Sequence, residues 1–131
     1  MKLVKVAAGV VNQTPLDWER NLSHILGAIA QAREEKVSIL CLPELCITGY
    51  GCEDAFYAAN THQKALEYLF KILPHTAGMV VSVGLPLLVH NKLYNCACLI
   101  TDGEILGFVA KKFLAGNGIH YEPRWFSPWT M

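Results

Sequence analysis

The sequence predicts a layered α/β protein with a mixed sheet. Apolar, β-branched runs alternate along the chain with segments whose apolar residues recur at helical spacing. The last third adds strand patterns joined by a tight-turn signal, which indicates antiparallel strands beside the parallel ones that a strand, helix, strand order favours. Of the 131 residues, 53% are hydrophobic and 17% are charged, a composition that indicates a folded chain with a buried core.

The first half of the chain alternates strand and helix patterns. Residues 3–11 are β-branched and almost continuously apolar, which predicts a strand covered on both faces. Residues 15–36 place leucine, isoleucine and alanine at helical spacing and predict a helix. Residues 37–43 predict a second buried strand. It ends at Pro43, because proline donates no hydrogen bond to a strand ladder.

The second half predicts one more helical region and a group of three strands. Residues 54–73 have a helical pattern, as one helix or as two divided near Asn60. Residues 78–112 predict three strands, and Asp102 with Gly103 forms the turn between the second and the third. Together with the first half, this order predicts an α/β sandwich built on a mixed sheet.

Charge and cysteine content exclude several kinds of partner. Eleven basic residues balance eleven acidic ones without a block of like charge, so neither nucleic acid nor a membrane surface is expected as a partner. No apolar run reaches the roughly 18 residues of a membrane span, and no cleavage site follows the N-terminal run. The five cysteines form no CxxC pair, which favours reduced thiols in a cytoplasmic protein over disulfides or a metal site.

Charged residues follow two of the predicted strands. Glu44 comes directly after the strand that Pro43 ends, and Lys111 follows the last strand of the chain. The simpler interpretation of each is a solvated surface or capping charge. Taken with Glu122, however, they offer two carboxylates and a lysine near strand ends, where ligands of α/β proteins bind. We therefore expect these three side chains to lie in contact and to share charge.

Five blocks of sequence carry a resemblance to a known family: VAAGVVNQ, NLSHILGAIAQA, LCLPELCITGY, YNCACLITDGEILGFVAKKFL and YEPRWFSP. In this order they resemble the N-terminal part of the nitrilase, or carbon-nitrogen hydrolase, superfamily. The longer stretches PELCITGYGCEDAF and KKFLAGNGIHYEPRWF are similar to the glutaminase part of bacterial glutamine-dependent NAD synthetases, a subgroup of that superfamily. The resemblance covers almost the whole chain and implies part of a four-layer α-β-β-α sandwich.

The same resemblance implies roles for individual residues. By motif, Glu44 is the general base, Lys111 stabilises the oxyanion, and Glu122 is a supporting carboxylate. Tyr50 is expected to contact the substrate beside Glu44. Ala115 stands where many members have proline, and none of the five cysteines matches the motif of the family's nucleophile. Three further aromatic residues are assigned to packing: Trp125, Phe126 and Trp129.

By this resemblance, residues 1–131 are the N-terminal portion of a glutaminase domain that releases ammonia from glutamine to amidate deamido-NAD. The segment itself holds no cofactor, whereas ATP with Mg²⁺ and deamido-NAD belong to a synthetase domain absent from the chain. Without the nucleophilic cysteine, the segment alone is expected to be inactive, with one sheet face left uncovered, and the full-length protein is expected to be a homo-oligomer. Two alternatives stay open: a superfamily amidase of other specificity, and a truncated, non-catalytic binding or assembly module.

Overall fold

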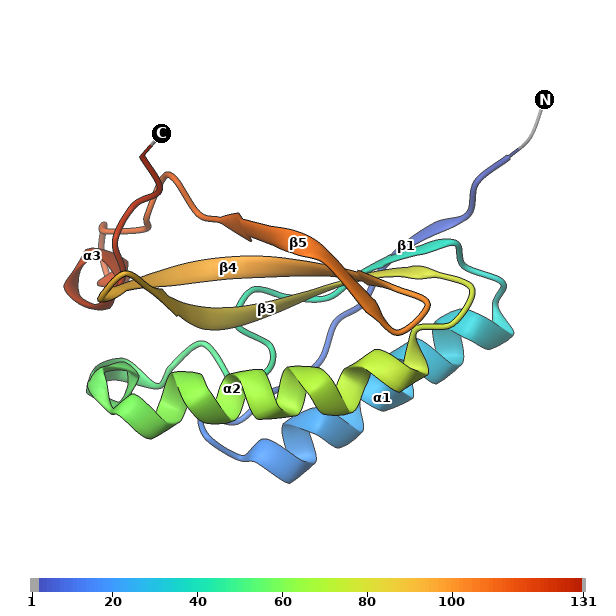
Figure 1. Ribbon diagram of the computed structural model, residues 1–131, viewed down its shortest axis with the longest axis horizontal. Coiled ribbons are helices and arrows are strands. Elements are labelled where there is room, and N and C mark those ends of the chain that lie inside the picture. Colours follow the sequence, from blue (N-terminus) through green and yellow to red (C-terminus); the bar gives the residue numbers. More distant parts are fainter. Residues whose placement is uncertain (1–2, 131) are drawn as a thin grey trace.

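The computed structural model describes residues 3–130 and shows a five-stranded sheet with two long helices packed on one face (Figure 1). The α/β class and the predicted order of elements are confirmed. The elements are β1 (Val6–Ala8), α1 (Trp18–Glu34), β2 (Ile39–Cys41), the 3-10 helix η1 (Glu53–Tyr57), α2 (Ala59–Ile72), the 3-10 turn η2 (Leu73–His75), β3 (Val80–Val89), β4 (Lys92–Thr101), β5 (Glu104–Ala110) and α3 (Glu122–Trp125).

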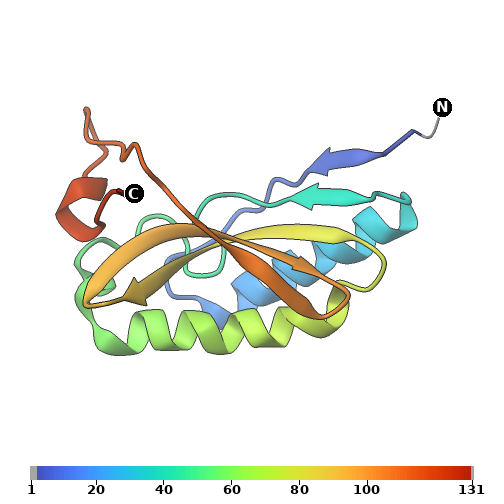
Figure 2. The same ribbon diagram turned by 45° about the horizontal axis from the view of Figure 1, so that its top comes forward.

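The sheet is mixed, as the sequence predicts. Its strands lie in the order β1-β2-β3-β4-β5; β1, β2 and β3 are parallel, and β4 is antiparallel to both of its neighbours. Figure 2 shows the twist of this sheet and the two helices side by side beneath it. Because β5 runs in the same direction as β2, the carboxyl ends of these two strands and the start of β4 point toward one end of the sheet.

The core lies between the sheet and the two helices. The buried face of α1 includes Ile25 and Ile29, and that of α2 includes Leu69 and Ile72. These side chains pack against alternate residues of the central strands, since every second strand residue faces the helices. Helix α1 starts at Trp18, later than the predicted residue 15, because the Asp17 side chain caps it by accepting a hydrogen bond from the Arg20 N–H.

The second helical region is divided, two residues earlier than predicted. Ala58 adopts an extended backbone between η1 and α2, and the Thr61 hydroxyl donates a hydrogen bond back to the Ala55 carbonyl at 2.7 Å. Pro74 falls in the 3-10 turn that follows α2, so the helix ends just before it, as a proline requires.

Two tight turns join the three last strands. Asp102 and Gly103 have φ values of 49° and 80°, so the predicted hairpin turn is confirmed. The turn between β3 and β4, at His90 and Asn91, has φ values of 47° and 60° and was not singled out in the sequence. Asn tolerates the left-handed conformation better than most residues, and Asn91 was the only local signal for this turn.

The prediction that the first strand is covered on both faces is wrong. The strand spans only Val6–Ala8 at the sheet edge, and the Val6 side chain is 66% exposed. In β2, similarly, Leu40 is buried against the helices while Ile39 and Cys41 are exposed. A continuous apolar run indicates burial on two faces, but in this chain helices cover only one.

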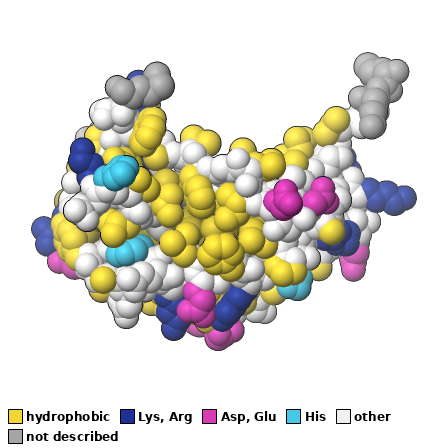
Figure 3. Space-filling model, viewed as in Figure 1, with side chains coloured by type: hydrophobic (Ala, Val, Ile, Leu, Met, Phe, Trp, Pro, Cys, Tyr) yellow, Lys and Arg dark blue, Asp and Glu magenta, His cyan; other side chains and the backbone are white. Residues whose placement is uncertain are grey.

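The uncovered face of the sheet carries mostly apolar side chains, several of them small. Its members alternate with the helix-facing residues along each strand, as the strand registers show. They are Val6, Ala8, Ile39, Cys41, Ser82, Ala97, Leu99, Gly107 and Val109. We call this set the open face. Gly84 lies on the same face but is buried beneath the loop that follows β2. Within residues 3–130, both long helices pack on the opposite face of the sheet. Hydrophobic side chains also gather in the middle of the surface in Figure 3, over β3, β4 and β5.

Within residues 3–130, no helix is long and apolar enough to cross a bilayer. All five cysteines are free thiols: four are buried, and Cys41 is exposed on the open face. The same described residues contain no group of three His, Cys, Asp or Glu side chains suited to a metal ion.

Candidate active site

Glu44 is presented by a loop that packs tightly onto β3. After β2 the chain crosses over Gly84, and the Ile47 N–H donates to the Gly84 carbonyl at 3.1 Å. A Cβ at position 84 would lie only 2.2 Å from the Leu45 nitrogen, so this approach requires glycine. The backbone beneath Glu44 is therefore fixed by β3.

Lys111 joins the two predicted carboxylates. It is the first residue after β5, and its Nζ lies 2.7 Å from Glu44 Oε1 and 3.0 Å from Glu122 Oε1. The predicted contact among the three side chains is confirmed. Both carboxylates outweigh the effect of burial and raise the pKa of Lys111, so the lysine stays protonated.

Glu122 is buried and its oxygens are fully used. The side chain is 2% exposed; Oε2 accepts the Ala115 N–H at 2.8 Å, while Oε1 accepts from Lys111 and from the Tyr50 hydroxyl. Burial alone raises the pKa of Glu122. The hydrogen bonds from Ala115, Lys111 and Tyr50 outweigh it, however, and hold that pKa below its ordinary value. Glu122 is thus a fixed negative charge.

Glu44 differs because only one of its oxygens is used. Oε1 accepts hydrogen bonds from Lys111 Nζ and from Asn95 Nδ2, whereas Oε2 accepts none from residues 3–130. The side chain is also 38% exposed. Of the two carboxylates, Glu44 alone has an oxygen free to take a proton from a reacting group.

Asn95 is a member of the site that sequence reasoning missed. It lies near the start of β4, is 4% exposed, and donates its side-chain amide to Glu44. The only signal was a polar residue inside the apolar strand pattern LYNCACLI. A buried polar side chain needs a partner, and in this case the partner lies 51 positions away in the sequence.

The structure places the Tyr50 hydroxyl against Glu122. It lies 2.8 Å from Glu122 Oε1 and 3.1 Å from His120 Nδ1. Since a carboxylate only accepts, Tyr50 donates to Glu122 and the imidazole nitrogen donates to Tyr50. Burial and this hydrogen bond raise the pKa of Tyr50, which keeps its proton.

A cluster of charges anchors the short helix that carries Glu122. Arg124 donates two hydrogen bonds to the Asp54 carboxylate, at 2.8 and 2.9 Å, and Trp125 Nε1 donates a third at 2.9 Å. The Arg124 guanidinium and the Trp125 N–H lower the pKa of Asp54 to about 2. This cluster ties α3 to η1 and so orients the start of α3.

The aromatic residues assigned to packing do pack. Phe126 is buried with its ring centroid 4.8 Å from that of Phe56, and Trp125 lies 6.0 Å from the same ring. Trp129 contacts Tyr94 edge to face but is 45% exposed. The packing prediction is therefore confirmed for Phe126 and Trp125, whereas Trp129 packs against Tyr94 with nearly half of its surface exposed.

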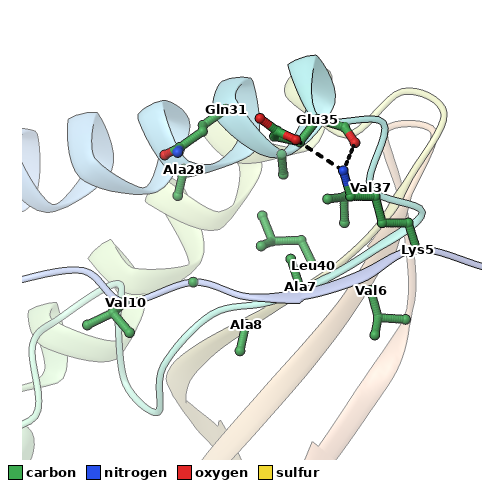
Figure 4. A pocket seen from close by; sticks show the side chains of 12 residues that line it. Lys5, Val6, Ala7, Ala8, Val10, Ala28, Gln31, Glu35, Val37 and Leu40 are labelled. Atoms are coloured by element: carbon green, nitrogen blue, oxygen red, sulfur yellow. Dashed lines mark hydrogen bonds and ion pairs between the residues drawn. The ribbon is translucent and has the colours of Figure 1, made fainter.

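A shallow hollow on the open face adjoins Glu44, Asn95 and Lys111 and is otherwise lined by small side chains such as Ser82 and Ala97. A second hollow, between β1 and α1, is mostly aliphatic (Figure 4). Its one ion pair, Lys5 with Glu35 at 3.0 Å, is half exposed. The first hollow combines a free carboxylate oxygen with a fixed cation, and it is the better candidate for chemistry.

The buried cysteines are poor nucleophiles. Burial raises the pKa of Cys46 and of Cys98 to about 12, that of Cys96 to about 11, and that of Cys52 by a smaller amount. A thiolate is the reactive form, and it is disfavoured in all four. This agrees with the failure of these cysteines to match a nucleophile motif.

Comparison with known proteins gives consistent results. A family model described as carbon-nitrogen hydrolase matches residues 5–130. The glutamine-dependent NAD(+) synthetase of Saccharomyces cerevisiae is 39% identical over 129 residues, which cover 97% of this chain and 18% of that protein. The crystal structure of a glutamine-dependent NAD(+) synthetase from Cytophaga hutchinsonii is 50% identical, with a TM-score of 0.95. The match covers 97% of this chain and 22% of the synthetase chain.

An amidase from Nesterenkonia sp. AN1 is also similar, at 25% identity and a TM-score of 0.82 over 98% of this chain and 51% of its own. Its structure shows acrylamide added to an active-site cysteine. Across the curated synthetases compared, the chain spans less than a fifth of their length.

Proposed function

The chain belongs to the carbon-nitrogen hydrolase family, and on this premise we propose that it is the N-terminal part of a glutaminase that supplies ammonia to an NAD synthetase. The substrate would be the side-chain amide of glutamine, and the ammonia would amidate deamido-NAD. The names and identities of the relatives support this assignment. The observation that carries it is the contact of Glu44, Lys111 and Glu122 at one end of the sheet.

In this proposal Glu44 is the general base. Its free Oε2 takes the proton of a cysteine thiol as the sulfur attacks the amide carbon. The C–N bond then breaks, and Glu44 returns the proton to the departing nitrogen, which leaves as ammonia. Glu44 next takes a proton from water as the water oxygen attacks the thioester carbon. The C–S bond then breaks, Glu44 returns the proton to the departing sulfur, and glutamate and the free thiol are released.

Lys111 would stabilise the negative oxygen that forms during each attack. Its ammonium is already held by two carboxylates, so it needs no reorganisation when charge develops. Glu122 keeps Lys111 protonated and in place but has no free oxygen with which to act as a base. Tyr50 would hold Glu122 and border the substrate.

The nucleophile would come from a part of the natural protein outside these 131 residues. The amidase of Nesterenkonia sp. AN1 has an active-site cysteine, which supports a cysteine in this role. In the same proposal, ATP with Mg²⁺ and deamido-NAD would be bound by a separate synthetase domain. Free thiols support a cytoplasmic location, and the balanced charge supports a protein that does not bind nucleic acid. That the full-length protein is a homo-oligomer is proposed from the family resemblance alone.

An amidase of other specificity is the second candidate, favoured by the likeness to the Nesterenkonia enzyme. Such an amidase would use the same three residues, Glu44, Lys111 and Glu122, and would differ only in the amide that it hydrolyses. A non-catalytic module is disfavoured because it would not need a carboxylate with one oxygen free beside a paired lysine.

The test is Glu44→Gln in the natural full-length protein. Glutamine keeps the size of the side chain but cannot accept the thiol proton, so glutamine-dependent NAD formation should fall by roughly 100- to 10,000-fold. Synthesis with free ammonium bypasses the hydrolysis and should change less than about threefold. Product formation is measured with each nitrogen donor.

The control is Glu34→Gln, at the exposed end of α1, which should retain both activities. Equal loss with glutamine and ammonium in Glu44→Gln would rule out the glutaminase role. Ammonia release from another amide, but none from glutamine, would select the amidase instead.

A further inference from the structure

We propose that Asn95 is a positioning residue that determines which oxygen of Glu44 acts as the base. The inference rests on the proposed function and deepens it. Asn95 Nδ2 donates to Glu44 Oε1, the oxygen that Lys111 also contacts, and so leaves Oε2 as the free acceptor. Asn95 lies in the block YNCACLITDGEILGFVAKKFL, but the family resemblance assigned it no role.

Asn95 is well suited to this role because it is itself fixed. It lies in β4, paired on both sides by β3 and β5, and it is 4% exposed. Its carbonyl accepts the Lys111 N–H at 2.8 Å, while its side chain holds Glu44. Asn95 therefore fixes both the backbone of Lys111 and the carboxylate of Glu44.

Lys111 alone could not select the oxygen. An ammonium has three donors that rotate freely and can follow either oxygen of a carboxylate. The amide of Asn95 is planar and its direction is set by a buried strand, so it favours one rotation of the Glu44 carboxylate. Because a carboxylate only accepts, the NH₂ group of Asn95 must face it.

The test uses Asn95→Ala and Asn95→Asp in the natural full-length protein. A hydrogen bond to a charged group is lost in both, so kcat for ammonia release from glutamine should fall about 10- to 100-fold. KM should change less than about threefold, because Asn95 acts on the base and not on the substrate. Asn95→Asp keeps the size of the side chain but brings a second carboxylate against Glu44, so its kcat should fall at least as far as that of Asn95→Ala.

The matched control is Asn21→Ala. Asn21 is similarly buried and bonds the backbone of Thr14 at 2.7 and 3.0 Å and, more weakly, the Ile47 carbonyl at 3.5 Å, but it does not touch Glu44. This variant should lower the melting temperature while kcat per folded molecule stays within about threefold. Thermal unfolding checks folding in every variant, and ammonium-dependent synthesis checks that the synthetase part is intact.

Crystal structures of the full-length protein and of Asn95→Ala give a readout independent of activity. The Glu44 carboxylate should keep one orientation in the first and rotate or occupy several in the second. An unchanged carboxylate with unchanged kcat would overturn the inference. If the unaltered protein releases no ammonia from glutamine, the proposed function fails, but the orientation of Glu44 still decides whether Asn95 positions it.

Discussion

Glu44 and Glu122 carry the same side chain and differ in how their oxygens are used. Glu122 accepts three hydrogen bonds while almost fully buried, and Glu44 accepts two on one oxygen while partly open to the hollow. Hydrogen bonds to the ionised form stabilise a charge in place, whereas an unused acceptor can react. The division of labour between a structural anion and a base follows from these contacts.

The lowered pKa of Glu122 predicts a pH dependence of stability. A carboxyl group whose pKa is lower in the folded state stabilises the fold above its unfolded pKa, about 4.3, and loses that contribution as the pH falls through the folded value. Glu122→Gln removes this titration. The urea midpoint of the unaltered protein should therefore fall more steeply from about pH 5 to about pH 3 than that of the variant.

The raised pKa of Lys111 acts at the opposite end of the scale. Its contribution is present below its unfolded pKa, about 10.4, and is lost only above the folded value, so it does not affect the acid slope. Glu34→Gln, at an exposed position, is the control and should keep the slope of the unaltered protein. Parallel acid slopes for Glu122→Gln and the unaltered protein would contradict the assigned role of Glu122.

Single elements were predictable where one local signal decides them. Asp102 and Gly103 gave the hairpin because both tolerate positive φ, and Pro74 lies just beyond the end of α2. The cap at Asp17 was not recognised, so α1 was expected to begin at residue 15 and begins at Trp18. The extent of β1 was not predictable in this way. The length of a strand depends on the strands that pair with it and on the elements that pack on its faces. Val6 is therefore exposed, although the apolar run around it indicates burial.

At the scale of elements, Gly84 couples β3 to the loop of the base. Gly84→Ala would put a Cβ against the backbone of Leu45 at 2.2 Å and of Glu44 at 2.8 Å, neither of which is a flexible side chain. The loop must shift, so glutamine hydrolysis should fall at least about tenfold and the melting temperature should drop by several degrees. Activity and thermal unfolding of the full-length variant are measured.

Gly27→Ala supplies the control. Gly27 lies at an exposed position of α1, away from the open face, and a Cβ there would meet nothing within 4 Å among the described residues. That variant should retain activity and stability. Equal behaviour of the two variants would show that the close approach at Gly84 does not hold the Glu44 loop in place.

At the scale of the molecule, the topology explains why distant residues meet. Glu44 and Lys111 are 67 positions apart, yet they follow β2 and β5, which run in the same direction, and Asn95 lies at the start of the antiparallel β4. The sequence could place the charged residues after strands. It could not identify Asn95, because nothing local to a strand shows which side chain will lie over it.

The open face predicts a difference in the reactivity of one thiol. Cys41 is exposed on this face, whereas Cys46, Cys52, Cys96 and Cys98 are buried. If a further layer covers the face in the natural protein, as the greater length of the relatives leads us to propose, a neutral alkylating reagent should label Cys41 in the 131-residue chain but not in the full-length protein.

Mass spectrometry of peptides after timed labelling under native conditions measures this protection. The expected result is that the rate at Cys41 falls at least about tenfold in the full-length protein, since a residue packed between two layers reacts only when the structure opens. Equally slow labelling of the four buried thiols in both forms serves as the control for folding. Rapid labelling of Cys41 in the full-length protein would mean that no layer packs on the open face. The hollow beside Glu44 would then face solvent. Lys111 needs a dry, enclosed site to stabilise an oxyanion, and the open face would not provide one.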